Sequence, residues 1–297
     1  MSYYQKDEMA FFEMASLVGL GSIPVEKRNP LKLETRGIGE LILQLVDQGV
    51  KTICVGIGGS ATNDGGIGMA AGLGVDFYDE QGHLLRPVGA SLGRVARIDT
   101  SAVPKALEDI DLQVLTDVTN PLCGSQGATY IFGGQKGLNP LLFPAIDQAM
   151  QGFYQLVDAR ILSMAGTGAG GGMAAGLVAF AGGQISSGIE KSLDLIDFDH
   201  KVQKADLVVV GEGRMDLQSL SGKAPVGVAK RTPEKIPVIA ICGSLAEDLP
   251  TFPSQNIDAT FSIVPGPCEV ADALAHAERN LISCARNIGN LLKMNAN

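Results

Sequence analysis

A cluster of charged and polar side chains follows one apolar segment of the chain. The stretch "GEGRMDLQSLSGK" (211–223) comes directly after "LVVV". The side chains in it that could take part in catalysis or binding are Glu212, Arg214, Asp216, Gln218, Ser219 and Lys223. Phosphoryl transfer needs carboxylates beside positive charges, because its catalysis consists mostly of positioning and charge neutralisation. A solvated, charged loop is the alternative, which the preceding apolar strand and the interleaved glycines weaken.

A glycine-rich stretch, "GIGGSATNDGG" (56–66), follows another apolar run. Its two glycine pairs would let the main chain approach a phosphate, and the hydroxyls of Ser60 and Thr62 would add donors. Asp64 would repel a bare phosphate, so its expected partner is a metal ion, a substrate hydroxyl or a helix N-terminus. A ligand site and an ordinary turn are equally compatible with these residues.

Two further charged residues stand at the ends of predicted elements. Asp117 lies at a strand end just before Asn120 and Pro121, where a metal site and a turn are equally plausible. Arg36 stands at a predicted helix N-terminus, where the helix dipole disfavours a positive charge. Such a placement suggests a functional role, for example binding a carboxylate.

A third glycine-rich stretch, "GTGAGG" (166–171), formally fits the dinucleotide pattern G-x-G-x-x-G. That pattern must follow a strand, and the preceding "FYQLVDARILSMA" is predicted to be helical, so the sequence supports an NAD site only weakly. A phosphate-holding loop of another kind is favoured, with a helix-packing turn as the alternative. The chain has no G-x-x-x-x-G-K-[ST] motif, so any nucleotide would be bound without a P-loop.

Alternating strands and helices predict the scaffold that positions these segments. Strands are predicted at 51–57, 205–213, 236–244 and 258–266, and helices at 35–49, 140–163, 222–231 and 269–293. This order is typical of an α/β fold with a parallel sheet, whose ligands bind beyond the carboxyl ends of the strands. We expect two α/β domains. Residues 1–64 and 186–297 form one with a parallel sheet, and residues 65–185 form an inserted, mixed domain.

The composition limits the classes of function. The 297 residues are 45% hydrophobic, enough for a sizeable core, and the net charge is -9. This charge argues against a nucleic-acid partner and against binding to an anionic membrane. Five cysteines without CxxC spacing indicate reduced thiols in a cytoplasmic protein. Neither a signal peptide nor an apolar run long enough to span a membrane is visible.

Six motifs, in order, resemble those of the bacterial glycerate kinases of the type I family. They are "TRGIGELI" (35–42), "GIGGSATNDGG" (56–66), "DVTNPLCG" (117–124), "FGGQKG" (132–137), "GTGAGGGM" (166–173) and "GEGRMDLQSLSGK" (211–223). The resemblance covers nearly the whole chain. Family members also carry an Asp-Ser-x-Lys motif after an initial strand and a later Ala-Asp-Gly-Gly-Glu-Gly-Thr motif. Neither is present here, so the resemblance also implies a chain without the family's N-terminal βαβ portion.

The resemblance implies a fold, an activity and a set of site residues. The family pairs a flavodoxin-like α/β domain with a second α/β domain, and transfers a phosphoryl group from ATP, with Mg²⁺, to D-glycerate. By resemblance, the residues that line the active cleft are Arg36, Asp64, Asp117, Glu212, Asp216 and Lys223. Those expected to approach the phosphates are Gly58, Gly59, Ser60, Gly168, Gly170 and Gly171.

The resemblance leaves two questions open. The product is expected to be 2-phosphoglycerate, with 3-phosphoglycerate as the alternative. The second question is whether the chain is an active kinase or a catalytically impaired homologue that only binds its ligand.

Overall fold

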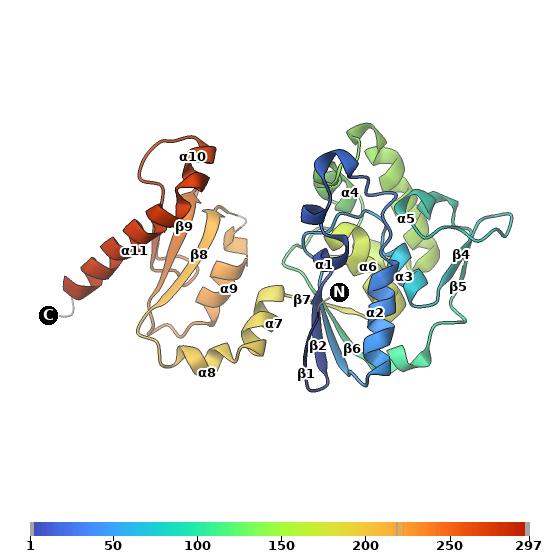
Figure 1. Ribbon diagram of the computed structural model, residues 1–297, viewed down its shortest axis with the longest axis horizontal. Coiled ribbons are helices and arrows are strands. Elements are labelled where there is room, and N and C mark those ends of the chain that lie inside the picture. Colours follow the sequence, from blue (N-terminus) through green and yellow to red (C-terminus); the bar gives the residue numbers. More distant parts are fainter. Residues whose placement is uncertain (1–2, 218, 222, 295–297) are drawn as a thin grey trace. The chain divides into compact units, whose positions relative to one another are not determined.

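The computed structural model describes residues 3–217, 219–221 and 223–294. Contacts divide the chain into two compact units, Met1–Gly188 and Ile189–Asn297. Figure 1 labels most of the helices and strands of each unit. Among the residues described, no helix is both long and apolar enough to cross a membrane.

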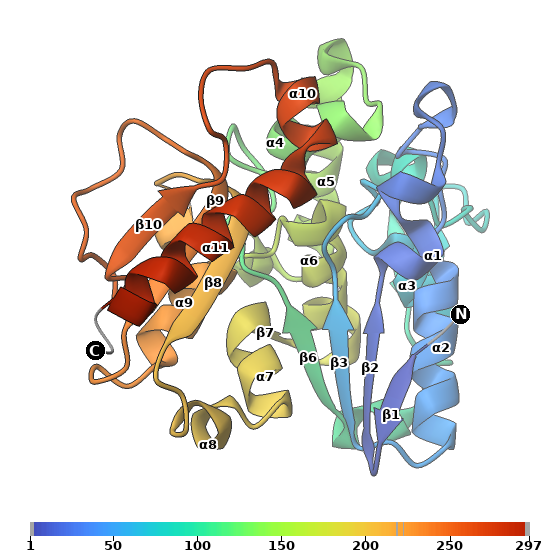
Figure 2. The ribbon, with the colours of Figure 1, turned by 60° about the vertical axis from the view of Figure 1, so that its left-hand side comes forward.

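Unit 1 is built on a five-stranded sheet of order β1-β2-β3-β6-β7. Its strands are β1 (Tyr4–Lys6), β2 (Met9–Glu13), β3 (Thr52–Gly56), β6 (Asp111–Leu115) and β7 (Gln184–Ser186). The last four run parallel, and β1 pairs antiparallel with β2. Figure 2 shows β2, β3 and β6 side by side. Glu13, Gly56 and Leu115 are in register, so the carboxyl ends of these strands form one edge.

The main core of unit 1 lies between this sheet and three helices, α2 (Arg36–Asp47), α3 (Ile67–Gly72) and α6 (Ala169–Ala181). Alternate strand residues face the helices because strand side chains point to opposite faces in turn. The largest buried members of this core are Phe12, Met14, Ile38, Ile42, Leu45, Ile53, Ile57 and Met69. Burial of this apolar face anchors the three helices to the sheet that carries the glycine-rich loops.

A second core of unit 1 lies around α5 (Phe143–Val157). It includes a two-stranded antiparallel sheet of β4 (Asp76–Tyr78) and β5 (Arg97–Asp99). Phe77 packs edge-on or tilted against Phe153 and Phe180. The remaining helices of this unit are α1 (Ala15–Val18) and α4 (Ala128–Phe132), and short 3-10 turns connect several elements.

Unit 2 holds a parallel sheet of order β10-β9-β8. Its strands are β8 (Val208–Met215), β9 (Val238–Leu245) and β10 (Ala259–Ser262). Its helices are α8 (Phe198–Val202), α9 (Ala224–Arg231), α10 (Val270–Ala275) and α11 (Ala277–Met294), and α7 (Gly188–Leu195) begins at the boundary between the units. A core that includes Val210, Val226 and Val238 joins α9 to the sheet.

The predicted α/β fold with parallel sheets is confirmed, and the four predicted buried strands correspond to β3, β8, β9 and β10. The predicted helix 269–293 is divided at His276 into α10 and α11. Strand β6 falls within the expected insert 65–185, yet it pairs with β3 of the expected segment 1–64. The contacts divide the chain once, after Gly188. The discontinuous arrangement of 1–64 with 186–297 remains a prediction.

The contact between α2 and α3 depends on glycine at the crossing point, which gives a test of the packing. A Cβ atom on Gly39 would collide with the carbonyl oxygen of Met69, whereas one on Gly152 in α5 would meet nothing within 4 Å. We expect Gly39→Ala to lower the free energy of unfolding by about 1–3 kcal/mol through overpacking. Gly152→Ala should be neutral or stabilising by up to ~1 kcal/mol, since alanine favours a helix. Urea unfolding measures both, and equal effects would contradict the packing.

Candidate active site

The loop that follows β3 presents main-chain donors at the carboxyl edge of the sheet. Gly58 and Gly59 are exposed, and the amides of Gly58, Gly59 and Ser60 donate to no acceptor among the residues described. Gly59 has a left-handed φ of 65°, which glycine adopts without strain. Successive amides left unpaired by such a turn form an anion-binding concavity. This stretch therefore has the donor set of a phosphate or carboxylate site.

Lys136 holds this loop from below. The lysine lies in a 3-10 turn (Gly134–Lys136) and is only 3% exposed. Its ammonium donates to the Ser60 hydroxyl oxygen at 2.8 Å and to the Thr62 carbonyl oxygen at 2.7 Å. Burial lowers the pKa of Lys136 from 10.5 to about 8, and the negative charge of Asp64 acts in the opposite direction. A buried positive charge thus lies beside the side chain of Ser60, whose own amide is one of the three unpaired amides.

Asp64 joins the loop to the starts of two helices and does not face solvent. Its carboxylate is fully buried and accepts from the Thr35 hydroxyl at 2.7 Å and from the Gly66 amide at 3.1 Å. Thr35 Oγ1 in turn accepts from the Met69 amide at 2.8 Å. Burial raises the pKa of the Asp64 carboxyl, although these hydrogen bonds and Lys136 counteract the effect. Of the partners expected for Asp64, the structure shows the helix N-terminus, and contact with substrate stays a prediction.

The glycines of "GTGAGGG" pack the backbone of one loop against that of another. Gly170, Gly171 and Gly172 are consecutive residues with positive φ, so the helical part of α6 begins after them. A Cβ on Gly171 would collide with the carbonyl oxygen of Thr62, and one on Gly168 with that of Pro121. The segment before this loop ends in a 3-10 helix (Ala159–Ser163) and not in a strand, so the context of a dinucleotide site is missing.

This packing assigns the glycines different positions. Gly168 and Gly171 are buried and Gly170 is half-buried, whereas Gly58 and Gly59 are exposed. The structure therefore presents the backbone of the loop after β3 to solvent, with the later loop as its support. Direct contact of Gly168, Gly170 and Gly171 with phosphate stays a prediction.

Two carboxylates lie at the carboxyl ends of the strands that flank β3. Asp117 follows β6, is exposed, and accepts from the Ser187 hydroxyl at 3.3 Å and from the Gly188 amide at 3.0 Å. Glu13 ends β2, and its carboxylate occupies the space that a Cβ on Gly56 would need. Desolvation at this position raises the pKa of Glu13. Both acids belong to the same sheet edge as the exposed amides.

The Arg36 side chain forms its contacts with residues of α3 and of the segment before α2. Its guanidinium contacts the Glu34 carboxylate at 3.0 Å and donates to the carbonyl oxygen of Ala71 at 3.2 Å. The side chain thus joins the start of α2 to the end of α3, where a cation is favoured by the helix dipole. Binding of substrate by Arg36 remains a prediction.

The charged segment of unit 2 forms a local cluster of its own. The Ser219 amide donates to the Asp216 carboxylate at 2.9 Å, and the Lys223 ammonium lies 3.8 Å from the same carboxylate. Glu212 lies on β8 beside Cys242, and its Oε1 is buried with no hydrogen-bond partner among the described residues. Gln218 lies outside the residues described. Asp216 and Lys223 are therefore brought together, and their catalytic roles remain predictions.

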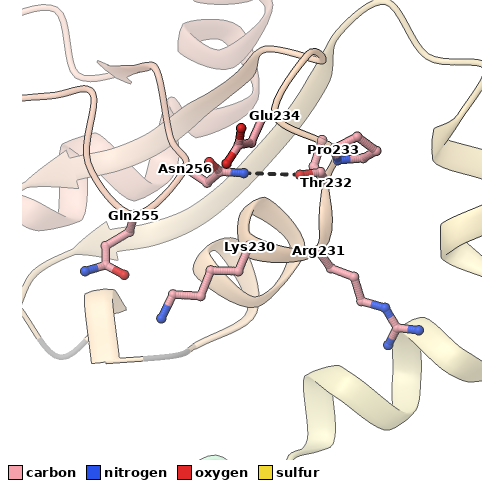
Figure 3. A pocket seen from close by; sticks show the side chains of 7 residues that line it. All are labelled: Lys230, Arg231, Thr232, Pro233, Glu234, Gln255 and Asn256. Atoms are coloured by element: carbon pink, nitrogen blue, oxygen red, sulfur yellow. Dashed lines mark hydrogen bonds between the residues drawn. The ribbon is translucent and has the colours of Figure 1, made fainter.

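Two of the hollows in unit 2 differ in their lining, and Glu212 of that cluster lines the larger of the two. One, of about 460 Å³, lies at the end of α9 (Figure 3) and is lined by Lys230, Arg231, Thr232, Pro233, Glu234, Gln255 and Asn256. The Asn256 amide group donates to the carbonyl oxygens of Ala229 and Thr232 at 2.9 and 3.1 Å, which caps the last turn of α9. The other, of about 880 Å³, is lined mostly by apolar residues and glycine from β8, β9, α10 and α11.

Lys136 and Glu13 were not singled out from the sequence. Lys136 lies within "FGGQKG", a motif noted only for its resemblance, and Glu13 is the last residue of β2. Nothing in the sequence indicated that the Lys136 ammonium would reach a loop more than seventy residues earlier.

The Thr35 hydroxyl acts as a clamp, because it is bonded both to the Asp64 carboxylate and to the Met69 amide. Loss of this clamp should lower the stability of the fold. Thr35→Val keeps the shape of the side chain but removes a donor to a buried carboxylate and an acceptor for the Met69 amide. We expect a loss of about 1–3 kcal/mol in the free energy of unfolding. Thr52→Val, at a β3 position whose hydroxyl makes no hydrogen bond to a described residue, should change it by less than ~0.5 kcal/mol. If both variants unfold at the same urea concentration, Thr35 is not a clamp.

Comparison with known proteins identifies the family of this site. The model of the glycerate kinase family matches residues 1–293. A glycerate kinase of Neisseria meningitidis serogroup B is 57% identical over 99% of this chain and 79% of its own length. Glycerate 2-kinase of Escherichia coli K12 is 40% identical, over 94% of this chain and 74% of its own. The crystal structure of a Salmonella typhimurium LT2 protein assigned as glycerate kinase 2 superposes with a TM-score of 0.78 at 42% identity, covering 97% of this chain and 77% of that one. This chain belongs to the glycerate kinase family.

Proposed function

We propose that this chain transfers the γ-phosphoryl group of ATP to D-glycerate in the cytoplasm. Family membership supports a kinase, and the names of the relatives support glycerate as the acceptor. The observation in the structure that carries the proposal is the row of unpaired amides at Gly58, Gly59 and Ser60, which lies at a strand end above a buried lysine. Such a row suits an anionic group, and both substrates are anions.

The carboxylates near the loop suit the acceptor hydroxyl and a cation. Glu13 ends β2 and Asp117 follows β6, the two strands that flank β3, and a carboxylate there can orient a hydroxyl or accept its proton. In unit 2, Asp216 with Lys223, and Glu212, supply further charges of the type that phosphoryl transfer uses. We assign Arg36 and Lys223 to neutralisation of carboxylate or phosphate, and Asp64 to the support of the loop.

The residues fit Mg²⁺ when the nucleotide supplies part of its ligands. Within the described part of the chain there is no group of three or more His, Cys, Asp or Glu side chains placed to hold a metal. Mg²⁺ commonly takes one or two carboxylates together with water and substrate phosphates. Asp117 or Glu13 would then provide the protein ligand, and the ion would neutralise charge on the transferred group.

We propose 2-phosphoglycerate as the product, because the Escherichia coli relative is a glycerate 2-kinase. Incubation of the purified chain with ATP, Mg²⁺ and D-glycerate, followed by ³¹P NMR, separates the two phosphoglycerates. A signal of 2-phosphoglycerate supports the proposal, whereas 3-phosphoglycerate overturns the assignment of the hydroxyl. A folded chain that binds ATP without turnover would instead support the alternative, a homologue that only binds its ligand.

The carboxylate roles lead to a kinetic prediction. Asp117→Asn and Asp216→Asn should each lower kcat/KM for D-glycerate by about 10²-fold or more, because they remove a charge from the reacting groups. Asp109→Asn, at an exposed position of unit 1, is the matched control and should retain the activity of the unaltered chain. A coupled assay of ADP release measures all three. Unchanged kcat/KM in both site variants would refute these roles.

A further inference from the structure

Lys136 is a buried cation whose contacts face a single loop. Its segment approaches the loop after β3 from more than seventy residues along the chain, and its ammonium has two short hydrogen bonds there, to Ser60 and Thr62. A buried ammonium is costly unless its protons are accepted. Both acceptors lie on the loop with the exposed amides, so the lysine and the shape of this loop depend on each other.

The lysine determines which role the Ser60 hydroxyl can play. An ammonium group has three donors and no acceptor, so Ser60 Oγ must accept from Lys136. The hydroxyl proton of Ser60 is then directed elsewhere, and in the described part of the chain no acceptor is bonded to it. Ser60 is thereby left as a donor beside the amides of Gly58, Gly59 and its own residue.

The charge of Lys136 is incompletely compensated where it lies. Asp64 is the carboxylate whose charge acts on the ammonium, but desolvation dominates and lowers the pKa of Lys136 to about 8. Arg28 donates to the carbonyl oxygen of the adjacent Gln135 at 3.3 Å. Tyr154, whose pKa burial raises well above 10, donates to the Gly65 carbonyl oxygen at 2.6 Å. An anion on the loop would stabilise the charged form of the lysine.

We propose that Lys136 is a positioning residue for the anion site: it orients the Ser60 hydroxyl as a donor to a bound phosphate and places a positive charge directly behind it. This inference rests on the proposed function for the choice of ATP as ligand. The binding of an anion at this loop does not depend on the proposed function. The alternative is a purely structural lysine that closes the loop and has no influence on the ligand.

A double-mutant cycle separates these roles. Lys136→Met and Ser60→Ala should each raise KM for ATP on the order of 10- to 100-fold, the value of a charge-assisted hydrogen bond. Because Lys136 acts through Ser60, the combined variant should be affected much less than the product of the single effects. Lys105→Met, on an exposed turn of the same unit, is the control and should behave as the unaltered chain.

The pH profile supplies a readout that a structural role would not move. KM for ATP in the unaltered chain should rise as the pH increases through about 8, since the lysine then loses its proton. The same rise should be absent in Lys136→Met, which retains Asp64, Arg28 and Tyr154. Independent effects of the two substitutions together with an unchanged profile would overturn the proposal.

Binding without turnover keeps the inference testable on its own. If Lys136→Met fails to fold, Ser60→Ala decides, because unchanged KM for ATP in that variant overturns the proposal. If the unaltered chain has no kinase activity, the proposed function fails. Stabilisation of its melting temperature by ADP or inorganic phosphate, measured against Ser60→Ala and Lys105→Met, then tests the anion site. Equal stabilisation of all three proteins would contradict a role for Ser60.

Discussion

The candidate site depends on direct contact between two glycine-rich backbones. The loop after β3 and the turn before α6 approach so closely that a Cβ on Gly171 would overlap the Thr62 carbonyl oxygen, and one on Gly172 would lie 2.7 Å from the Cα of Gly65. Main-chain atoms have no rotamers, so such a contact fixes the loop more rigidly than side-chain packing would. The amides at Gly58 and Gly59 are thus held in place before any ligand arrives.

Buried polar groups maintain this arrangement at a cost in stability. Asp64 and Lys136 are both buried near the loop, and desolvation shifts both pKa values toward the neutral forms. Thr62 Oγ1 and Asn63 Oδ1 are buried without a hydrogen-bond partner among the described residues. An arrangement that served stability alone would avoid such groups. Their concentration beneath exposed amides is typical of a site in which anion binding is favoured over local stability.

The fold followed from the sequence because hydrophobic periodicity reports burial directly. The strand at 51–57 and those after residue 204 were identifiable as apolar runs, and helix α2 by its spacing of Ile38, Ile42 and Leu45. The pairing of β6 with β3 was missed, since a single sequence does not specify which strands become neighbours. The domain boundary expected at 64–65 stays a prediction, with β3 before it and β6 after it paired in one sheet.

The site was predictable only in part, because glycine has several uses. The loop 56–66 was identified from its composition and from its place after a buried strand. Composition does not distinguish Gly58, which is exposed with open space beside its Cα, from Gly171, whose missing side chain lets two backbones touch. The contacts of Lys136 could not be predicted because its partners, Ser60 and Thr62, are distant in sequence.

We infer that the amides of Gly58, Gly59 and Ser60 form an anion site that exists before the ligand binds. Titration of the ¹⁵N-labelled chain with ADP, followed by amide chemical shifts, tests it most directly. We expect large shifts, saturating together, at these three residues, and little change at Gly82 and Gly152, two exposed glycines outside the loop after β3. Shifts confined to other parts of the chain, with Gly58, Gly59 and Ser60 unmoved at saturation, would show that these amides do not form the anion site.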